Sequence, residues 1–277
     1  MARLIAPRLG ERLGQQVVID NRPGATGNIG AELAAHAPPD GYTVLMAGAS
    51  IAINVSLYRK LAYDILKDFV AVTSVAVSPN IVLVHPSLPA HSIAELIALA
   101  RQRPGQLNYA SGGSGSTLHL TAELFKSMTG VNITHVPYKS TGPALIAVIA
   151  GEVAIIMPPL AGTLSHVESG RLRALAVTST TRVKMVQQLP TVAEAGVPGF
   201  ESGQWYGVFV PAAAPADIVT KLRTEIARVV RIPEVADQIT QQGSIPVGDA
   251  PEQFGAYLRQ DIAKWAKVVK ASGARVE

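Results

Sequence analysis

The sequence predicts an α/β protein of two domains, and three observations support this. The chain has 277 residues, which suits two domains of roughly 120 to 150 residues each. Short runs rich in β-branched residues alternate along it with segments of helical periodicity. Hydrophobic residues make up 48% of the chain and charged residues 16%, a composition that excludes a disordered chain and a coiled coil.

The first residues predict an amphipathic helix, because Ile5, Leu9 and Leu13 recur at four-residue spacing with arginines between them. No apolar region of the kind found in signal peptides follows this helix. The remaining alternation predicts nine strands. They are residues 17–20, 43–47, 70–77, 81–84, 107–111, 132–136, 153–157, 172–178 and 205–210.

Helix starts are marked by capping boxes. In a capping box a Ser or Thr hydroxyl accepts the backbone N–H of the residue three positions later, and a glutamate at that position accepts the backbone N–H of the Ser or Thr. Ser92 and Glu95 mark one such start, and Thr191 and Glu194 mark a shorter helix. The last helix is expected to begin near Asp249. Its predicted buried face comprises Phe254, Leu258, Ile262, Trp265 and Val269.

Charge and composition exclude several classes of function. The net charge is +4, from 24 basic and 20 acidic side chains that are scattered, so no nucleic-acid-binding face is expected. The absence of cysteine excludes disulfides, thiolate metal sites and cysteine nucleophiles, and the six histidines lack metal-ligand spacing. The apolar stretch 143–162 is interrupted by Gly151 and Pro158, so we expect no membrane span.

Two apolar runs indicate how the domains are connected. Residues 70–84 form a run too long for one ordinary strand, and residues 205–211 have the same character. They predict a chain that crosses into a second α/β lobe and later returns. We expect lobe 1 to comprise residues 1–78 and 209–277, and lobe 2 to comprise residues 79–208.

A glycine-rich segment from Gly24 to Gly30 lies between the predicted strand 17–20 and a predicted helix at 31–37, as in dinucleotide-binding turns. Residues 21–23 separate the strand from the first glycine, and no acid ends the next strand. A turn that lets a helix pack closely on a strand explains the same glycines. An oxidoreductase that binds NAD(P) is therefore the alternative interpretation.

Hydroxyl and small residues follow three predicted strands. After 107–111 they lead directly into a helix, where backbone N–H groups and hydroxyls favour an anion site, although a flexible surface loop would fit too. The segments 48–54 and 137–143 repeat this pattern. The predicted ligand-binding residues are Ser50, Asn54, Ser111, Ser114, Ser116, Thr117, His119, Tyr138, Lys139 and Thr141.

No acid–base pair accompanies these loops, and the segment 112–116 lacks the final glycine of a nucleophile elbow. Donors without a positioned base indicate binding rather than catalysis. We therefore expect no catalytic residue, no metal and no cofactor.

Seven motifs occur in order along the chain. They are Asn21-Arg-Pro-Gly-Ala-Thr-Gly-Asn-Ile-Gly30, Pro39-Asp-Gly-Tyr-Thr43, Asn54 with Ser56-Leu-Tyr58, Leu107-Asn-Tyr-Ala-Ser111, His135-Val-Pro-Tyr-Lys139, Arg171-Leu-Arg-Ala-Leu-Ala-Val177 and Leu189-Pro-Thr-Val-Ala-Glu-Ala-Gly196. Together they resemble the Bug (TctC-type) receptors, which are extracytoplasmic solute-binding proteins of tripartite tricarboxylate transporters.

The resemblance implies a two-lobed type II periplasmic-binding-protein (Venus flytrap) fold, in which each lobe is a sheet flanked by helices. It implies that a small carboxylate is held in the cleft between the lobes. It further implies a periplasmic location, membrane transporter subunits as partners, and a monomer.

Two departures from the family pattern bear on this interpretation. Members begin with a signal peptide, a first strand and a glycine-rich loop of the ligand site, whereas this chain begins in the helix that follows. We expect either a start further upstream or a truncated first lobe with an exposed strand edge. Many members carry an aspartate at the position of Pro158, so a plain carboxylate is favoured over an amino acid. A cytosolic ligand sensor or a truncated, nonfunctional form is a further alternative.

Overall fold

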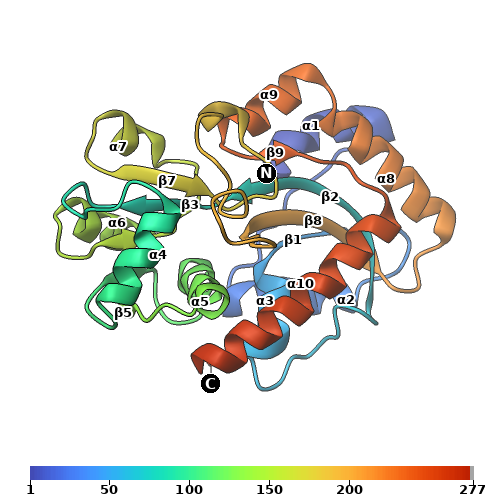
Figure 1. The fold of residues 1–277 in the computed structure, drawn as a ribbon. Coiled ribbons are helices and arrows are strands. Elements are labelled where there is room, and N and C mark those ends of the chain that lie inside the picture. Colours follow the sequence, from blue (N-terminus) through green and yellow to red (C-terminus); the bar gives the residue numbers. More distant parts are fainter. Residues whose placement is uncertain (275–277) are drawn as a thin grey trace. The chain divides into compact units, whose positions relative to one another are not determined.

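A computed structural model describes residues 1–274, which form two compact units. Unit 1 comprises residues 1–77 and 205–267, and unit 2 comprises residues 78–204 and 268–274. The chain passes from unit 1 to unit 2 within strand β2 (Phe69–Pro79) and returns within strand β8 (Gly203–Pro211), as Figure 1 shows. Residues 275–277, which end the predicted lobe segment 209–277, lie outside the described residues.

Unit 1 contains a four-stranded sheet in the order β1-β8-β2-β9. Strand β1 (Leu45–Gly48) runs antiparallel to β8, and the short β9 (Ile245–Pro246), which was not predicted, runs antiparallel to β2. The helices of this unit are α1 (Ala2–Leu13), η1 (Ala25–Gly27), α2 (Asn28–Ala35), α3 (Ser50–Leu57), α8 (Ala216–Val230), α9 (Pro233–Gln241) and most of α10 (Pro251–Ser272).

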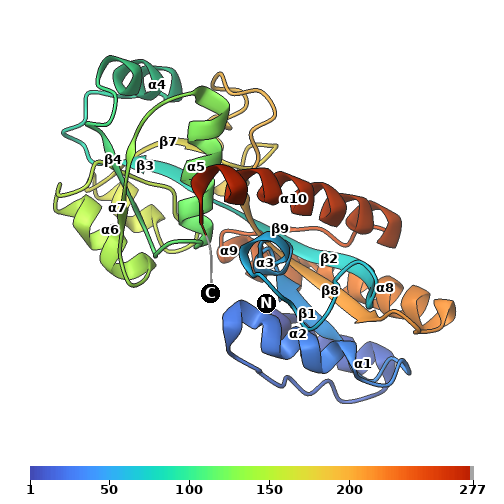
Figure 2. The same cartoon turned by 90° about the horizontal axis from the view of Figure 1, so that it is seen from below.

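Side chains of β8 alternate between the two faces of this sheet, as the period of a strand requires. Val208 and Val210 pack with apolar residues of α1, α8 and α9 on one face. Trp205 and Phe209 pack on the other face against Phe254 of α10, with ring centroids 5.5 and 5.2 Å from that ring. Figure 2 shows α10 along one face and α1 along the opposite face.

Unit 2 contains a five-stranded sheet in the order β5-β4-β6-β3-β7. Strand β4 (Asn108–Ser111) is parallel to β5 (Thr134–Pro137) and to β6 (Ile155–Ile156). Strand β3 (Ile81–Val84) is antiparallel to β6 and to β7 (Arg173–Val177). The helices of this unit are α4 (Ile93–Gln102), α5 (Thr117–Thr129), α6 (Thr141–Ile149), α7 (Leu164–Glu168) and η2 (Lys184–Val186).

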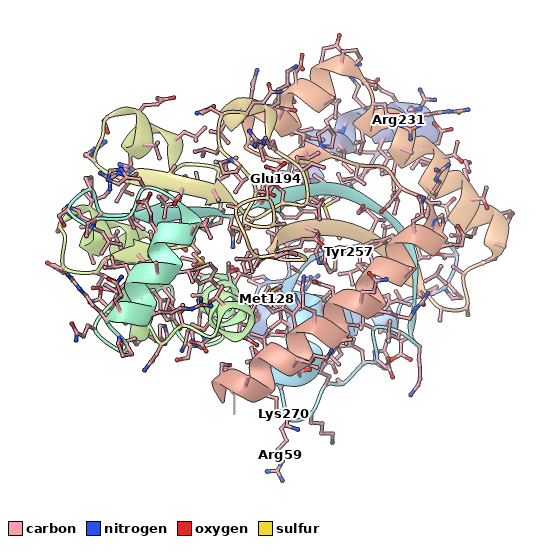
Figure 3. The ribbon with its side chains drawn as sticks, in the orientation of Figure 1. Arg59, Met128, Glu194, Arg231, Tyr257 and Lys270 are labelled. Carbon is pink, nitrogen blue, oxygen red and sulfur yellow. The ribbon has the colours of Figure 1, made fainter. Side chains whose placement is uncertain are left out.

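Two local predictions are wrong. Residues 17–20 are extended but pair with no strand, and Val18 is 78% exposed. The Thr191–Glu194 capping box forms, with both of its hydrogen bonds at 3.0 Å, yet Glu194 lies in a turn rather than in a helix (Figure 3). The last helix, α10, begins at Pro251, close to Asp249 as predicted, and the carboxylate of Asp249 accepts the backbone N–H and the hydroxyl of Ser74 on β2.

The apolar stretch 143–162 divides as predicted into the end of α6, a turn and β6. Within residues 1–274 no helix has the length and hydropathy that a membrane crossing requires.

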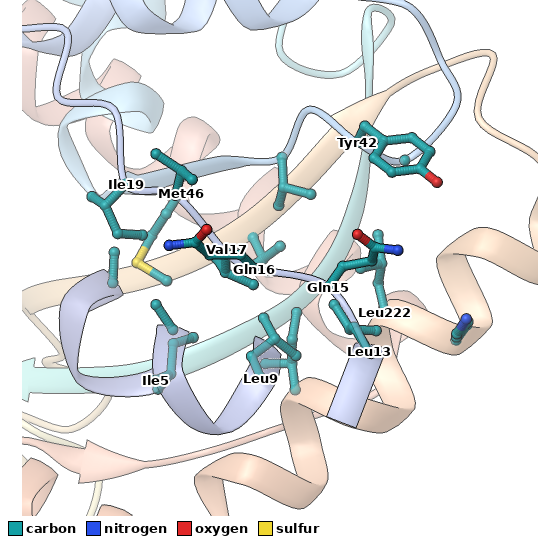
Figure 4. Close-up of a pocket in the computed structure, with 18 of the residues that line it drawn as sticks. Ile5, Leu9, Leu13, Gln15, Gln16, Val17, Ile19, Tyr42, Met46 and Leu222 are labelled. Atoms are coloured by element: carbon teal, nitrogen blue, oxygen red, sulfur yellow. The ribbon is translucent and has the colours of Figure 1, made fainter. Parts of the chain in front are cut away.

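Unit 1 also contains an apolar cavity of about 580 Å³ beside the outer edge of β1 (Figure 4). Leu9 of α1, Met46 of β1 and Leu222 of α8 line it together with the extended residues 15–19. None of the ten predicted ligand-binding residues lines this cavity. It is therefore separate from the candidate site described next.

Candidate functional site

The register of the unit 2 sheet brings two of the predicted loops together. Ser111 at the end of β4 pairs with Pro137 at the end of β5, so the loops 112–116 and 138–140 leave the sheet side by side. The N–H of Tyr138 donates to the carbonyl oxygen of Ser111 at 3.0 Å. A Cβ added at Gly112 would lie 3.2 Å from the backbone nitrogen of Thr141, so a larger residue here would require this backbone to shift by a few tenths of an ångström.

Two helix N-termini therefore meet at one edge of the sheet, because α5 begins at Thr117 and α6 begins at Thr141. The first N–H groups of a helix have no partner within the helix, and the helix dipole is positive at this end. The side chains of Thr117 and Thr141 are half-buried at these starts. This arrangement suits an anion with several acceptor oxygens, such as a carboxylate.

Ser116 has a structural role beside its predicted one. Its hydroxyl oxygen caps α5 by accepting the N–H of His119 at 3.3 Å. The hydroxyl hydrogen remains a donor that a ligand oxygen could accept. Of the other predicted residues in these loops, Ser114 and Lys139 are exposed and Tyr138 is half-buried.

Ser111 is fully buried, and its hydroxyl is engaged inside the protein. It accepts the N–H of Gly113 at 3.1 Å and lies 3.2 Å from the carbonyl oxygen of the same residue. Its oxygen also lies 2.6 Å from Nε2 of His135. A serine–histidine pair of this kind can form a nucleophile in enzymes. Here the serine oxygen is buried and stabilises the turn at Gly113 by accepting its N–H.

His119 belongs to a buried stack of rings that sequence reasoning missed. Its ring centroid is 4.1 Å from that of His135, which is in turn 5.0 Å from that of Tyr109. Nδ1 of His119 accepts the N–H of Gly115 at 3.0 Å. No local sequence signal gives this stack, because it depends on the strand register, in which Tyr109 and His135 are direct partners on parallel strands.

Burial shapes the electrostatics of this stack. Together with the neighbouring His135, it lowers the pKa of His119 to about 4. The pKa of His135 is lowered as well, chiefly by burial. Burial also raises the pKa of Tyr109, whose hydroxyl donates to Glu123 at 2.6 Å. Both imidazoles are therefore neutral near pH 7.

The two predicted residues of unit 1 lie on α3. Ser50 is its first residue and is half-buried, whereas Asn54 is fully buried. The side-chain amide of Asn54 donates to Oδ1 of Asn28 at 2.7 Å and to the carbonyl oxygen of Thr26 at 3.2 Å. Asn54 thereby braces the glycine-rich turn, in which Thr26 has the rare left-handed backbone with φ 56°.

The glycine-rich turn lacks the surroundings that a dinucleotide site needs. The fingerprint requires a strand immediately before the turn, and residues 17–20 form no strand. Within residues 1–274 no three His, Asp or Glu side chains are grouped so that they could hold a metal ion.

Comparison with known proteins adds an independent line of evidence. The family model described as the tripartite tricarboxylate transporter family receptor matches residues 1–274. The protein BugT of Bordetella pertussis is 36% identical, with 100% of this chain and 86% of BugT covered.

Two solved structures are similar to the whole chain. Rpa4515 of R. palustris, solved with adipate, has 43% identity and a TM-score of 0.80, and the match covers 98% of this chain and 91% of that one. MatC of Rhodopseudomonas palustris, solved with bound malate, has 32% identity and a TM-score of 0.75, with 97% and 92% covered.

Proposed function

Because this chain belongs to the tripartite tricarboxylate transporter family of receptors, we propose that it captures a small carboxylate at the paired helix starts of unit 2. Members of this family are extracytoplasmic solute receptors and not enzymes. The fold is the predicted α/β fold of periplasmic binding proteins, with a sheet flanked by helices in each unit. The oxidoreductase alternative is not favoured.

The observation that carries the proposal is the meeting of α5 and α6 at the end of β4. Each helix start offers backbone N–H groups and a threonine hydroxyl, and a carboxylate has two oxygens that accept several hydrogen bonds each. The relatives solved with adipate and with malate hold acids of this class. A periplasmic location and a membrane transporter as partner belong to the same proposal and are supported by the family. A monomeric state is part of the proposal as well.

A thermal-shift screen tests the ligand class. Adipate, malate, citrate, aspartate and NADPH are added separately to the full chain. A ligand at 100 times its Kd stabilises the folded state by about 2.7 kcal/mol, which raises Tm by roughly 5 to 11 °C for a chain of this size. We expect shifts with the plain carboxylates. A shift with NADPH alone would restore the oxidoreductase interpretation, and no shift with any acid would contradict the receptor proposal.

The double substitution Ser116→Ala and Thr117→Ala tests the loop. If these hydroxyls bind the ligand, adipate affinity should fall by about 1 to 3 kcal/mol, measured by isothermal titration calorimetry. Ser116 also caps α5, and losing a cap lowers stability by about 0.5 to 2 kcal/mol. Ser92→Ala is the matched control, because Ser92 caps α4 in the same unit by the same hydrogen bond. Equal affinity in the double variant and in the control would remove the loop from the site.

A further inference from the structure

Two histidines of the ring stack formed by His119, His135 and Tyr109 contact the loop 112–116 and the residue before it. Ser111, at the root of the loop, is fixed by the contact of its hydroxyl with Nε2 of His135 at 2.6 Å. Gly115, near the far end of the loop, is fixed by its N–H bond to Nδ1 of His119 at 3.0 Å. One pair of stacked imidazoles therefore fastens both ends of the loop.

The bond from Gly115 determines the protonation state of His119. A backbone N–H is only a donor, so Nδ1 of the ring must present a lone pair and the ring proton must lie on Nε2. A proton added at Nδ1 would leave two N–H groups facing each other, and the bond could not exist. The loop geometry seen here requires the neutral ring.

We propose that His119, backed by His135, is the positioning residue of the anion-binding loop 112–116, and that a proton gained at Nδ1 of His119 releases this loop. The role of the loop in binding a carboxylate rests on the proposed function, whereas the fastening of the loop does not. Neither imidazole is needed to touch the ligand. His119 acts through Gly115, and His135 acts through Ser111.

The charged and titratable groups around His119 come from three elements. They are Tyr109 on β4, His135 on β5, and Glu123 and Lys126 on α5 itself. Glu123 favours a proton on His119, but its carboxylate already accepts the Tyr109 hydroxyl at 2.6 Å and pairs with Lys126 at 2.7 Å. His119 is only 5% exposed, and its pKa is lowered to about 4 by burial and by His135. The loop is therefore fastened at neutral pH and released in acid.

Two substitutions separate the acceptor from the ring. His119→Asn places an amide oxygen where Nδ1 stands and cannot titrate, whereas His119→Phe keeps a stacked ring but has no acceptor. His91→Asn is the control, because His91 is an exposed histidine of the same unit. Adipate affinity is measured by calorimetry from pH 7 to pH 4.

We expect His119→Phe to bind adipate about tenfold more weakly than the unchanged protein at pH 7, the equivalent of one hydrogen bond, and His119→Asn, which keeps the acceptor, to recover most of this loss. Adipate itself gains protons in acid, which also weakens its binding, but this loss of affinity is the same for all variants. The unchanged protein and His91→Asn should lose more affinity between pH 7 and pH 4 than His119→Asn loses. Equal losses in all three would overturn the proposal.

A readout without ligand distinguishes failure of this inference from failure of the proposed function. The ¹⁵N chemical shifts of His119 should show Nε2 protonated and Nδ1 unprotonated at pH 7. The Gly115 amide should be protected from hydrogen exchange in the unchanged protein and in His119→Asn, and unprotected in His119→Phe. These results would support the fastening of the loop even if no acid binds. A proton on Nδ1 at pH 7, or equal Gly115 exchange in the unchanged protein and in His119→Phe, would overturn the inference. The ¹⁵N measurement is made on the unchanged protein, so it remains decisive even if His119→Phe does not fold.

Discussion

Asp261 of α10 is a buried carboxylate, only 3% exposed, and each of its oxygens has a partner. Oδ2 accepts the indole N–H of Trp205 at 2.9 Å, and Oδ1 pairs with Lys264 one turn later at 2.7 Å. A buried charge is tolerated when it is paired in this way. Asp261 thereby joins α10 to β8 within unit 1.

Replacing Asp261 by alanine should therefore lower the free energy of unfolding by about 1 to 3 kcal/mol, because the buried N–H of Trp205 loses its acceptor. Asp261→Asn keeps an oxygen for the indole and loses only the charge, so it should be the milder change. Urea unfolding followed by tryptophan fluorescence measures both. Equal stability of the two variants would mean that the pair with Lys264 matters and the indole bond does not.

The candidate site shows which residues the sequence could predict. The hydroxyl and glycine residues from Ser111 to Thr117 were found because they follow a strand and precede a helix, which is local information. The buried contacts of the Ser111 hydroxyl with Gly113 and His135 were missed because the direction of this side chain depends on the register of β4 against β5. The stack of His119 on His135 was missed for the same reason, since it joins residues that only the folded sheet brings together.

Secondary structure elements were predicted well where the pattern was local. The first helix and the Ser92 cap match α1 and α4, and eight of the predicted strands have counterparts in the two sheets. Residues 17–20 failed because an apolar run becomes a strand only when a neighbouring strand pairs with it. The helix predicted after Thr191 did not form, although its capping box did, because an N-cap stabilises the first turn of a helix but does not supply the further turns that stabilise the rest.

Gly207 on β8 shows how closely α10 packs on the sheet of unit 1. A Cβ at this position would lie 2.1 Å from the tip of the Phe254 ring and 3.0 Å from the ring of Trp205. Gly207→Ala should therefore be destabilising by about 1 to 3 kcal/mol, the usual penalty of overpacking a core. Thermal unfolding of Gly207→Ala beside Gly142→Ala tests this, because a Cβ at Gly142 meets no atom within 4 Å. Equal Tm values would show that Phe254 moves aside without penalty.

The stability of the chain should depend on pH through His119. Its pKa is about 4 in the folded protein and near the ordinary 6.5 when unfolded, so between these values the unfolded chain binds more protons. The free energy of unfolding should therefore fall as the pH drops from 6.5 to 4, by up to about 1.4 kcal/mol per pH unit. His135, whose pKa is also lowered, adds to this trend.

Urea unfolding followed by far-ultraviolet circular dichroism at pH 7, 6 and 5 measures this dependence. His119→Asn should show a shallower decline than the unchanged protein, since one of the groups that titrate on unfolding is gone. The exposed His91→Asn serves as the control and should keep the full slope. Identical slopes in all three proteins would mean that His119 titrates normally in the folded state.

The strand order of unit 1 also has a consequence for biosynthesis. Strand β8 stands between β1 and β2 in that sheet, although it follows them by more than a hundred residues. The sheet of unit 2 draws all its strands from the uninterrupted stretch 78–204. On the ribosome the middle of the chain can therefore complete its sheet first, while β1 and β2 wait for residue 211 to be made. During that interval the apolar residues of the nascent amino-terminal part are open to chaperones.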